Sequence, residues 1–87
     1  MAVSNAQFTV GLTPVPIDGR SEMPYRILIQ NMDDSADAYI GNQNVTIDNG
    51  YRLAKGEVVQ LVVNPLDTIY VVSNKAGHRM CWIRDSF

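Results

Sequence analysis

The sequence predicts an all-β fold: a small antiparallel β-sandwich or a partly open barrel of about seven to eight short strands, with no long helix. Short runs of β-branched and aromatic residues alternate with turn residues, and a new run begins about every 8 to 12 residues. No window keeps the three- or four-residue apolar spacing of an amphipathic helix over about ten residues.

At 87 residues the chain has the length of one small domain. We expect a single β domain over residues 1–87, in three parts. Residues 1–6 are small and polar and are expected to form an extended N-terminal arm, residues 7–24 an edge strand and a loop, and residues 25–84 the core of the sandwich.

The N-terminal third predicts one strand and one edge segment. Residues 7–12 alternate apolar and polar side chains, which is the pattern of a strand with one apolar face. Pro14 and Pro16 cannot donate ladder hydrogen bonds, so residues 13–17 are expected to be extended and to lie at a sheet edge. Turn residues predict a loop over residues 18–24.

The middle of the chain predicts a strand and then a three-stranded meander. Residues 25–31 read as a strong strand. Residues 39–53 contain two turn signals, at residues 41–44 and at Asn49-Gly50, where both residues tolerate the positive φ of a type I′ turn. We therefore expect short strands at residues 38–40, 45–47 and 51–53.

The last third predicts three strands, over residues 57–63, 68–73 and 78–84, and these carry apolar residues on both faces. An isolated antiparallel sandwich usually shows one polar, wet face to each strand. Two explanations are open: loops or the N-terminal segment cover the second face, or another subunit covers it. The low charged content of 18% favours another subunit.

Composition argues against several classes of function. The net charge is −2 and the seven basic residues form no cluster, which argues against nucleic-acid binding. No apolar run is long enough to cross a membrane, and no signal peptide is visible at the N-terminus. Cys81 is the only cysteine, so no intrachain disulfide forms, which fits synthesis in a reducing cytosol.

No catalytic, cofactor or metal site is expected. His78 and Cys81 are three residues apart, so on a strand they point to opposite faces and cannot act as a nucleophilic pair. Residues 33–37 place three carboxylates in one loop, as a solvated turn or, alternatively, a weak calcium site. Read as an EF-hand the loop fails, because Ala38 stands where glycine is needed and Asn44 where glutamate is needed.

Aromatic and large apolar residues are the candidates for an interface. Three of the aromatics, Tyr39, Tyr51 and Trp82, would alternatively serve as stacking platforms in a carbohydrate- or receptor-binding module. The full set of interface candidates is Phe8, Tyr39, Tyr51, Tyr70, Met80, Trp82 and Phe87.

The chain resembles small structural virion proteins of tailed bacteriophages, a group that includes head-decoration or cement-like β-sandwiches. The resemblance covers about residues 25–84. It rests on residues 27–31 (Ile-Leu-Ile-Gln-Asn), 38–41 (Ala-Tyr-Ile-Gly), 45–46 (Val-Thr), 49–53 (Asn-Gly-Tyr-Arg-Leu), Gly56 and 68–73 (Thr-Ile-Tyr-Val-Val-Ser).

The resemblance implies a structural protein that binds the capsid surface and stabilises subunit contacts, or a neck or tail component. It implies synthesis in the cytoplasm of the bacterial host and localisation in the virion. It further implies the major capsid protein or another virion protein as partner, and a homo-oligomer, expected to be a trimer.

Overall fold

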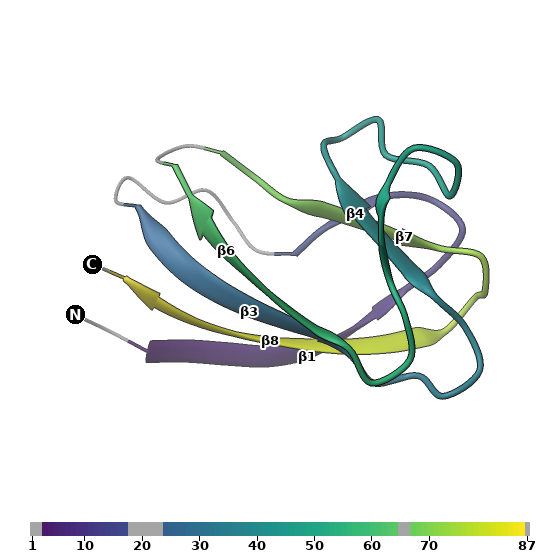
Figure 1. Cartoon of the computed structure of the whole chain (residues 1–87), viewed down its shortest axis with the longest axis horizontal. Helices are drawn as coiled ribbons and strands as arrows, with labels where there is room; N and C mark the ends of the chain where they lie inside the picture. The colour runs from purple at the N-terminus through teal and green to yellow at the C-terminus, as the bar shows by residue number, and fades with distance from the viewer. Residues whose placement is uncertain (1–2, 18–23, 65–66, 87) are drawn as a thin grey trace.

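A computed structural model describes residues 3–17, 24–64 and 67–86 of the chain, and the expected all-β fold is confirmed. Eight strands form two four-stranded antiparallel sheets, and the described residues contain no helix (Figure 1). The first sheet has the order β1-β8-β3-β6 and the second β2-β7-β4-β5. This is the strand order of a jelly roll, in which the chain passes repeatedly between two facing sheets.

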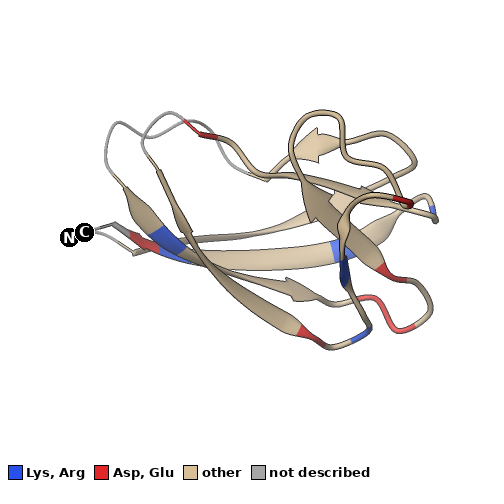
Figure 2. Cartoon of the chain, turned by 45° about the horizontal axis from the view of Figure 1, so that its top comes forward, with Lys and Arg blue, Asp and Glu red and all other residues tan. Residues whose placement is uncertain are grey.

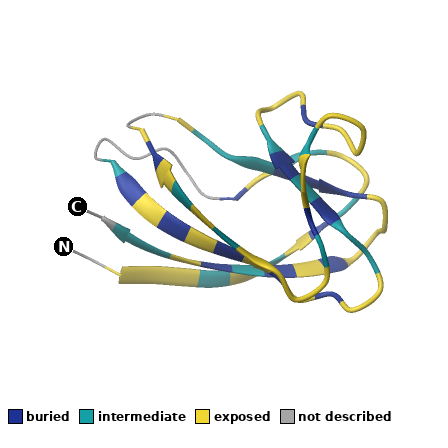
Figure 3. Ribbon diagram, in the orientation of Figure 1, coloured by how far each residue is buried: buried dark blue, intermediate teal, exposed yellow. Residues whose placement is uncertain are grey.

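The first sheet contains the longer strands. They are β1 (Val3–Val10), β8 (His78–Ser86), β3 (Tyr25–Asn31) and β6 (Val58–Val63). β3 lies between β8 and β6, and its residues alternate strictly between buried and exposed (Figure 3). Ile27 and Ile29 are fully buried, and each such side chain contributes about 1.5–3 kcal/mol of transfer free energy. β3 is therefore the centre of the core.

The second sheet is built from shorter strands: β2 (Val15–Pro16), β7 (Tyr70–Ser73), β4 (Ala38–Gly41) and β5 (Tyr51–Leu53). The expectation that the proline segment lies at an edge agrees with the position of β2 at the end of this sheet. The core between the sheets holds Ala38, Ile40, Leu53 and Val71 from this side.

Residues 3–6, the described part of the expected N-terminal arm, form part of a strand instead of an arm. Residues 3–6 belong to β1 and pair with β8, with Val3 opposite Asp85 and Ala6 opposite Trp82. An edge strand can form with few apolar residues, because its neighbour pairs with half of its backbone groups and water reaches the other half. Residues 1–2 of the expected arm lie outside the described part, as do residues 18–23 of the expected loop.

The prediction of a third strand at residues 45–47 is wrong. β4 pairs directly with β5, and residues 42–50 form a loop between them. In this loop Thr46 N–H donates to Asn49 Oδ1 at 2.7 Å, and Thr46 Oγ1 accepts from the backbone of residues 48 and 49. Such local side-chain bonds compete with ladder hydrogen bonds and stop a three-residue run from becoming a strand.

The expected type I′ turn at Asn49-Gly50 is also wrong. The described glycines with positive φ are Gly56 and Gly77, which occupy the turns after β5 and before β8. Position 50 requires glycine because there is no room for a side chain: a Cβ there would lie 2.7 Å from Tyr39 Cβ and 2.7 Å from Val45 Cγ2. The loop thus packs directly on the outer side of the second sheet and buries Val45.

Candidate interaction surface

The outer face of the first sheet carries two uncharged rows of side chains across all four strands. The register of the strands defines the rows. They are Gln7, Cys81, Gln30 and Val58 in one row, and Asn5, Ile83, Leu28 and Gln60 in the next. Leu28 and Ile83 are direct neighbours and keep 40% and 46% of their surfaces exposed, so an apolar centre faces solvent.

Charged groups stand at the two ends of this outer face (Figure 2). At one end Arg26 Nη2 lies 3.3 Å from Asp85 Oδ2. At the other, Arg79 Nη2 donates to Gln7 Oε1 at 3.0 Å. The charged residues thus lie outside the two central rows, and Arg79 reaches one row only at its end, at Gln7.

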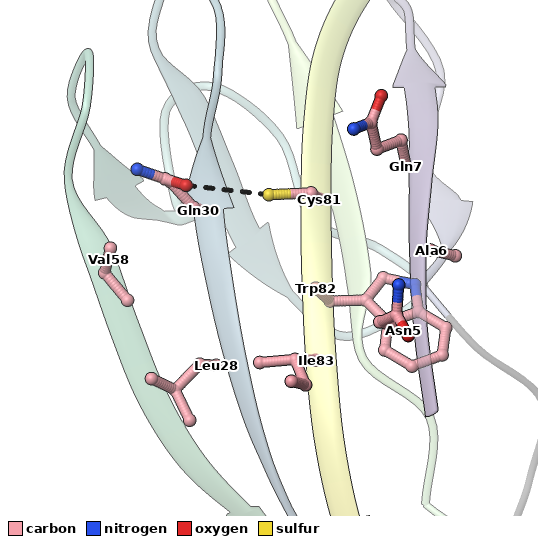
Figure 4. Close-up of a pocket in the computed structure, with 9 residues that line it drawn as sticks. All are labelled: Asn5, Ala6, Gln7, Leu28, Gln30, Val58, Cys81, Trp82 and Ile83. Carbon is pink, nitrogen blue, oxygen red and sulfur yellow. Dashed lines mark hydrogen bonds between the residues drawn. The ribbon is translucent and has the colours of Figure 1, made fainter. Parts of the chain in front are cut away.

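A shallow hollow of about 380 Å³ lies beside the outer face (Figure 4). Its lining includes the thiol of Cys81, which donates to Gln30 Oε1 over 3.6 Å, and no charged side chain. Among the described residues of its lining, the thiol of Cys81 is the group with acid–base or nucleophilic chemistry, and the other side chains are apolar, amide or indole groups.

The predicted interface residues are not brought together. Met80 and Trp82 are buried in the core of the single chain, and Trp82 also contributes to the lining of the hollow beside the outer face. Phe8, Tyr39 and Tyr70 are half-buried and Tyr51 is 63% exposed, whereas Phe87 lies outside the described residues.

Tyr39 and Tyr51, two of the three aromatic residues expected as alternative stacking platforms, lie on opposite faces of the second sheet. Tyr51 pairs with Ile40, the residue next to Tyr39, so Tyr39 and Tyr51 belong to opposite faces of the second sheet. They cannot stack on one sugar ring.

Apolar residues were expected on both faces of the strands, and the two sheets differ in whether their outward apolar residues are covered. Val72, on the outer side of β7, is only 3% exposed and lines a hollow together with Val45 of the loop 42–50. On β6, by contrast, Val58 and Val62 remain 52% and 62% exposed. The chain's own loop covers the second sheet, and the first sheet stays open.

The acidic loop at residues 33–37 is occupied by protein cations. Asp33 accepts from Lys75 Nζ at 2.9 Å and from Ser35, and Asp37 Oδ2 lies 3.0 Å from Arg52 Nε. The bonds from Lys75 and Ser35 hold the pKa of Asp33 well below its ordinary value. Among the described residues, no group of three or more acidic, histidine or cysteine side chains could hold a metal ion.

A buried polar network lies behind this loop, and sequence reasoning missed it. His78 Nε2 is 2.7 Å from Asn31 Oδ1, and His78 Nδ1 is 2.8 Å from Ser73 Oγ. A serine and a histidine in hydrogen-bond contact are the elements of a nucleophilic pair. Here both are almost completely buried, so a substrate has no approach to Ser73 Oγ.

As expected, His78 and Cys81 point to opposite sides of β8: His78 faces the core, and Cys81 lines the hollow on the outer face. No helix in the described part of the chain is long and apolar enough to cross a membrane.

The two edges of the first sheet carry no charge and no proline. β1 (Val-Ser-Asn-Ala-Gln-Phe-Thr-Val) forms one edge and β6 (Val-Val-Gln-Leu-Val-Val) the other. Natural edge strands are usually protected by charge, proline, a bulge or shortness. The second sheet has that protection: β2 is two residues long and contains Pro16, and β5 is three residues long and contains Arg52.

An apolar hollow of about 320 Å³ opens between the sheets on the β6 side. We call it the flank hollow, and it is lined by Ile40, Gly41, Tyr51, Val59, Leu61 and Ile69. Val59 and Leu61 are the inward-facing residues of β6 there, and both are half-buried.

No family model matches the chain, and no curated protein matches it. One solved structure is similar over nearly the whole chain: a protein from the work titled "Bacillus endospore appendages form a novel family of disulfide-linked pili". The TM-score is 0.59 at 18% identity, covering 99% of this chain and 86% of the other. At this identity the likeness shows a shared fold.

This comparison overturns the phage assignment. The solved structure that matches is described as an endospore appendage protein, and no family model or curated virion protein matches the chain. The predictions of a capsid-decorating function and of virion localisation are therefore wrong. They rested on β-turn sequences such as Asn49-Gly50-Tyr51, which are common to many β-proteins and identify none.

Proposed function

We propose that this protein is a structural subunit that assembles with copies of itself, and that its first sheet continues from one copy to the next through pairing of β6 with β1. The observation that carries the proposal is the pair of long, uncharged edges on one sheet. Each edge presents unpaired backbone donors and acceptors to solvent.

The direction of the strands allows this pairing to repeat. Each neighbouring pair in the first sheet is antiparallel, so the edges β1 and β6 of this four-stranded sheet run in opposite directions. Two copies in the same orientation therefore place β6 beside an antiparallel β1. Such a contact joins two different surfaces, and contacts of that kind lead to open chains or rings rather than to closed dimers.

The likeness to an appendage protein supports a role in a homopolymer, with one difference. That protein belongs to a family described as disulfide-linked pili. A chain with one cysteine takes part in at most one disulfide, so disulfides can join these subunits into pairs but not into a polymer. Copies of this protein are therefore expected to associate mainly through non-covalent contacts.

A charge placed on the β6 edge tests the proposal. Gln60 stands exposed in the middle of β6, and a lysine at an edge blocks strand addition. We expect sedimentation velocity and negative-stain microscopy to show oligomers for the wild type and monomers for Gln60→Lys. Gln43→Lys adds the same charge on the exposed loop 42–50 and should assemble like the wild type. A wild type that stays monomeric up to about 1 mM would overturn the proposal.

A further inference from the structure

The flank hollow marks a place where the core lacks a covering strand. Ile27 and Ile29 on β3 are fully buried, whereas their partners Leu61 and Val59 on β6 are only half-buried. The inner surface of β6 is therefore covered on the β3 side and open on the other. Among the described residues the lining is apolar except for the hydroxyl group of Tyr51, and Gly41 adds no side chain.

The opposite flank of the sandwich is closed by the chain itself. After β1 the chain crosses to the second sheet, and Ser73 N–H donates to Gly11 O at 2.9 Å. Phe8 and Ala6, the inward residues of β1, pack against the core cluster. The molecule thus carries on one flank a strand with apolar inward residues, and a strand of that kind is missing on the other flank.

We propose that the flank hollow is the receptor for Phe8 of a second copy, seated there when β1 of that copy pairs with β6. The inference rests on the proposed function and specifies the register in which β1 of one copy pairs with β6 of the next. Aligning the middle of β1 with the middle of β6 in antiparallel pairing sets Phe8 opposite Val59 and Ala6 opposite Leu61. In this register inward residues meet inward residues, so the side-chain alternation of both strands is kept.

The size and chemistry of the hollow fit this occupant. An apolar cavity of about 150 Å³ in another protein holds a benzene molecule. The flank hollow, at about 320 Å³ and open to one side, has room for a phenyl ring that enters on an added strand. Beside it, the small Ala6 leaves space for Leu61, so large and small residues alternate across the new pair.

Disulfide trapping tests the register. In a Cys81→Ser background, Phe8→Cys with Val59→Cys places two thiols on the inner side of the proposed pair. β1 and β6 of one copy are separated by three strand spacings, about 14 Å, so this bond can only join two copies. We expect mild oxidation to give a ladder of covalent oligomers on a non-reducing gel, with the native circular dichroism spectrum retained.

Two matched pairs complete the experiment. Gln7→Cys with Gln60→Cys is the outward pair of the same register and should also cross-link. Phe8→Cys with Gln60→Cys places the two thiols on opposite sides of the sheet, so this variant should not cross-link and should run as a monomer on the non-reducing gel. Cross-linking of the outward pair without the inward pair would overturn the seating of Phe8 and leave edge-to-edge assembly standing. If no pair cross-links while the wild type assembles, the register itself is overturned.

A separate variant tests the seating of the ring. Leu61→Trp fills the flank hollow from its own chain and leaves the edge backbone unchanged. We expect association to weaken by about tenfold or more, while the urea midpoint of the monomer is unchanged or higher. Unchanged association in this variant would show that nothing enters the hollow and would overturn the inference.

Discussion

The Nε2 atom of His78 lies 2.7 Å from Oδ1 of Asn31, and this contact fixes the ring nitrogen that carries the hydrogen in the neutral form of a histidine that solvent does not reach. Asn31 Nδ2 donates to the carbonyl oxygens of Ala36 and Leu53, each at 3.0 Å, so its Oδ1 must be the atom that faces the ring. An amide oxygen only accepts, so Nε2 carries the hydrogen.

In the neutral ring the second nitrogen, Nδ1, is an acceptor. Ser73 Oγ lies 2.8 Å from His78 Nδ1 and 3.4 Å from the carbonyl oxygen of Asp37, and its single hydrogen goes to the closer acceptor. The neutral ring thus has both nitrogens satisfied. Burial lowers the pKa of His78, which agrees with the neutral form, although the nearby carboxylates of Asp33 and Asp37 act in the opposite direction.

We predict that stability falls as the pH drops through the histidine range. The pKa of His78 is lowered in the fold, so below its ordinary value of 6.5 the unfolded chain binds a proton that the folded chain does not. The stabilisation is complete above that value and is lost progressively as the pH falls toward the folded pKa. Urea unfolding at about pH 8 and about pH 5.5 measures the difference.

His78→Gln is the control for this effect. Glutamine keeps a donor and an acceptor but does not titrate, so the variant should be less stable at every pH and should lose most of the pH dependence in this range. If the free energy of unfolding changes with pH equally in the wild type and the variant, a group other than His78 causes the pH dependence.

A second loss of stability is predicted at lower pH, from the pair of Asp33 and Lys75. The pKa of Asp33 is lowered in the fold, so its contribution is present above the ordinary value of 3.8 and is lost as the pH falls below it. Asp33→Asn should reduce the slope of the free energy of unfolding against pH in this acid range. Lys75→Met should reduce that slope only in part, because the bonds from Ser35 remain. If Lys75→Met leaves the acid slope unchanged, the ion pair is not its cause.

The alternation of residue types was enough to predict most of the fold. Residues 25–31 have the period-two pattern, and the structure buries Ile27 and Ile29 while exposing Arg26 and Leu28. That pattern is local, so it can be seen without knowing the neighbouring strands. The segment 45–47 failed because Thr46 and Asn49 bond to the nearby backbone, and a residue-type pattern does not show such bonds.

The interior network and the open edges could not be predicted in the same way. Asn31 and His78 are 47 residues apart, and neither residue type signals the other. Which strands become edges depends on strand order, which the sequence does not show. A signal is present in β1, where mostly polar and small residues precede Phe8, but this composition is typical of an extended arm as well as of an edge strand.

Gly50→Ala is predicted to destabilise the fold by about 1–3 kcal/mol, because overpacking a tight contact has that cost. The added Cβ would meet Tyr39 Cβ and Val45 Cγ2 at 2.7 Å and the carbonyl oxygen of Thr46 at 3.0 Å. Thermal and urea unfolding should both show the loss.

Gly11→Ala is the matched control for the glycine test. A Cβ at Gly11 would have no heavy atom within 4 Å, so we expect no loss of stability, or a gain of up to about 1 kcal/mol from a less flexible unfolded chain. If both substitutions cost the same, steric contact between the loop 42–50 and the second sheet is not what requires glycine at position 50.

The single cysteine sets an upper limit on covalent assembly. Cys81 is half-buried on the outer face of the first sheet, and each chain can form one disulfide at most. We predict that fully oxidised wild-type assemblies, denatured without reductant, run on a gel as monomers and dimers only. Cys81→Ser should assemble like the wild type by sedimentation, because β1 and β6 do not contain this residue. Loss of assembly in Cys81→Ser, or in the wild type under reductant, would mean that a disulfide-linked dimer is the unit that associates.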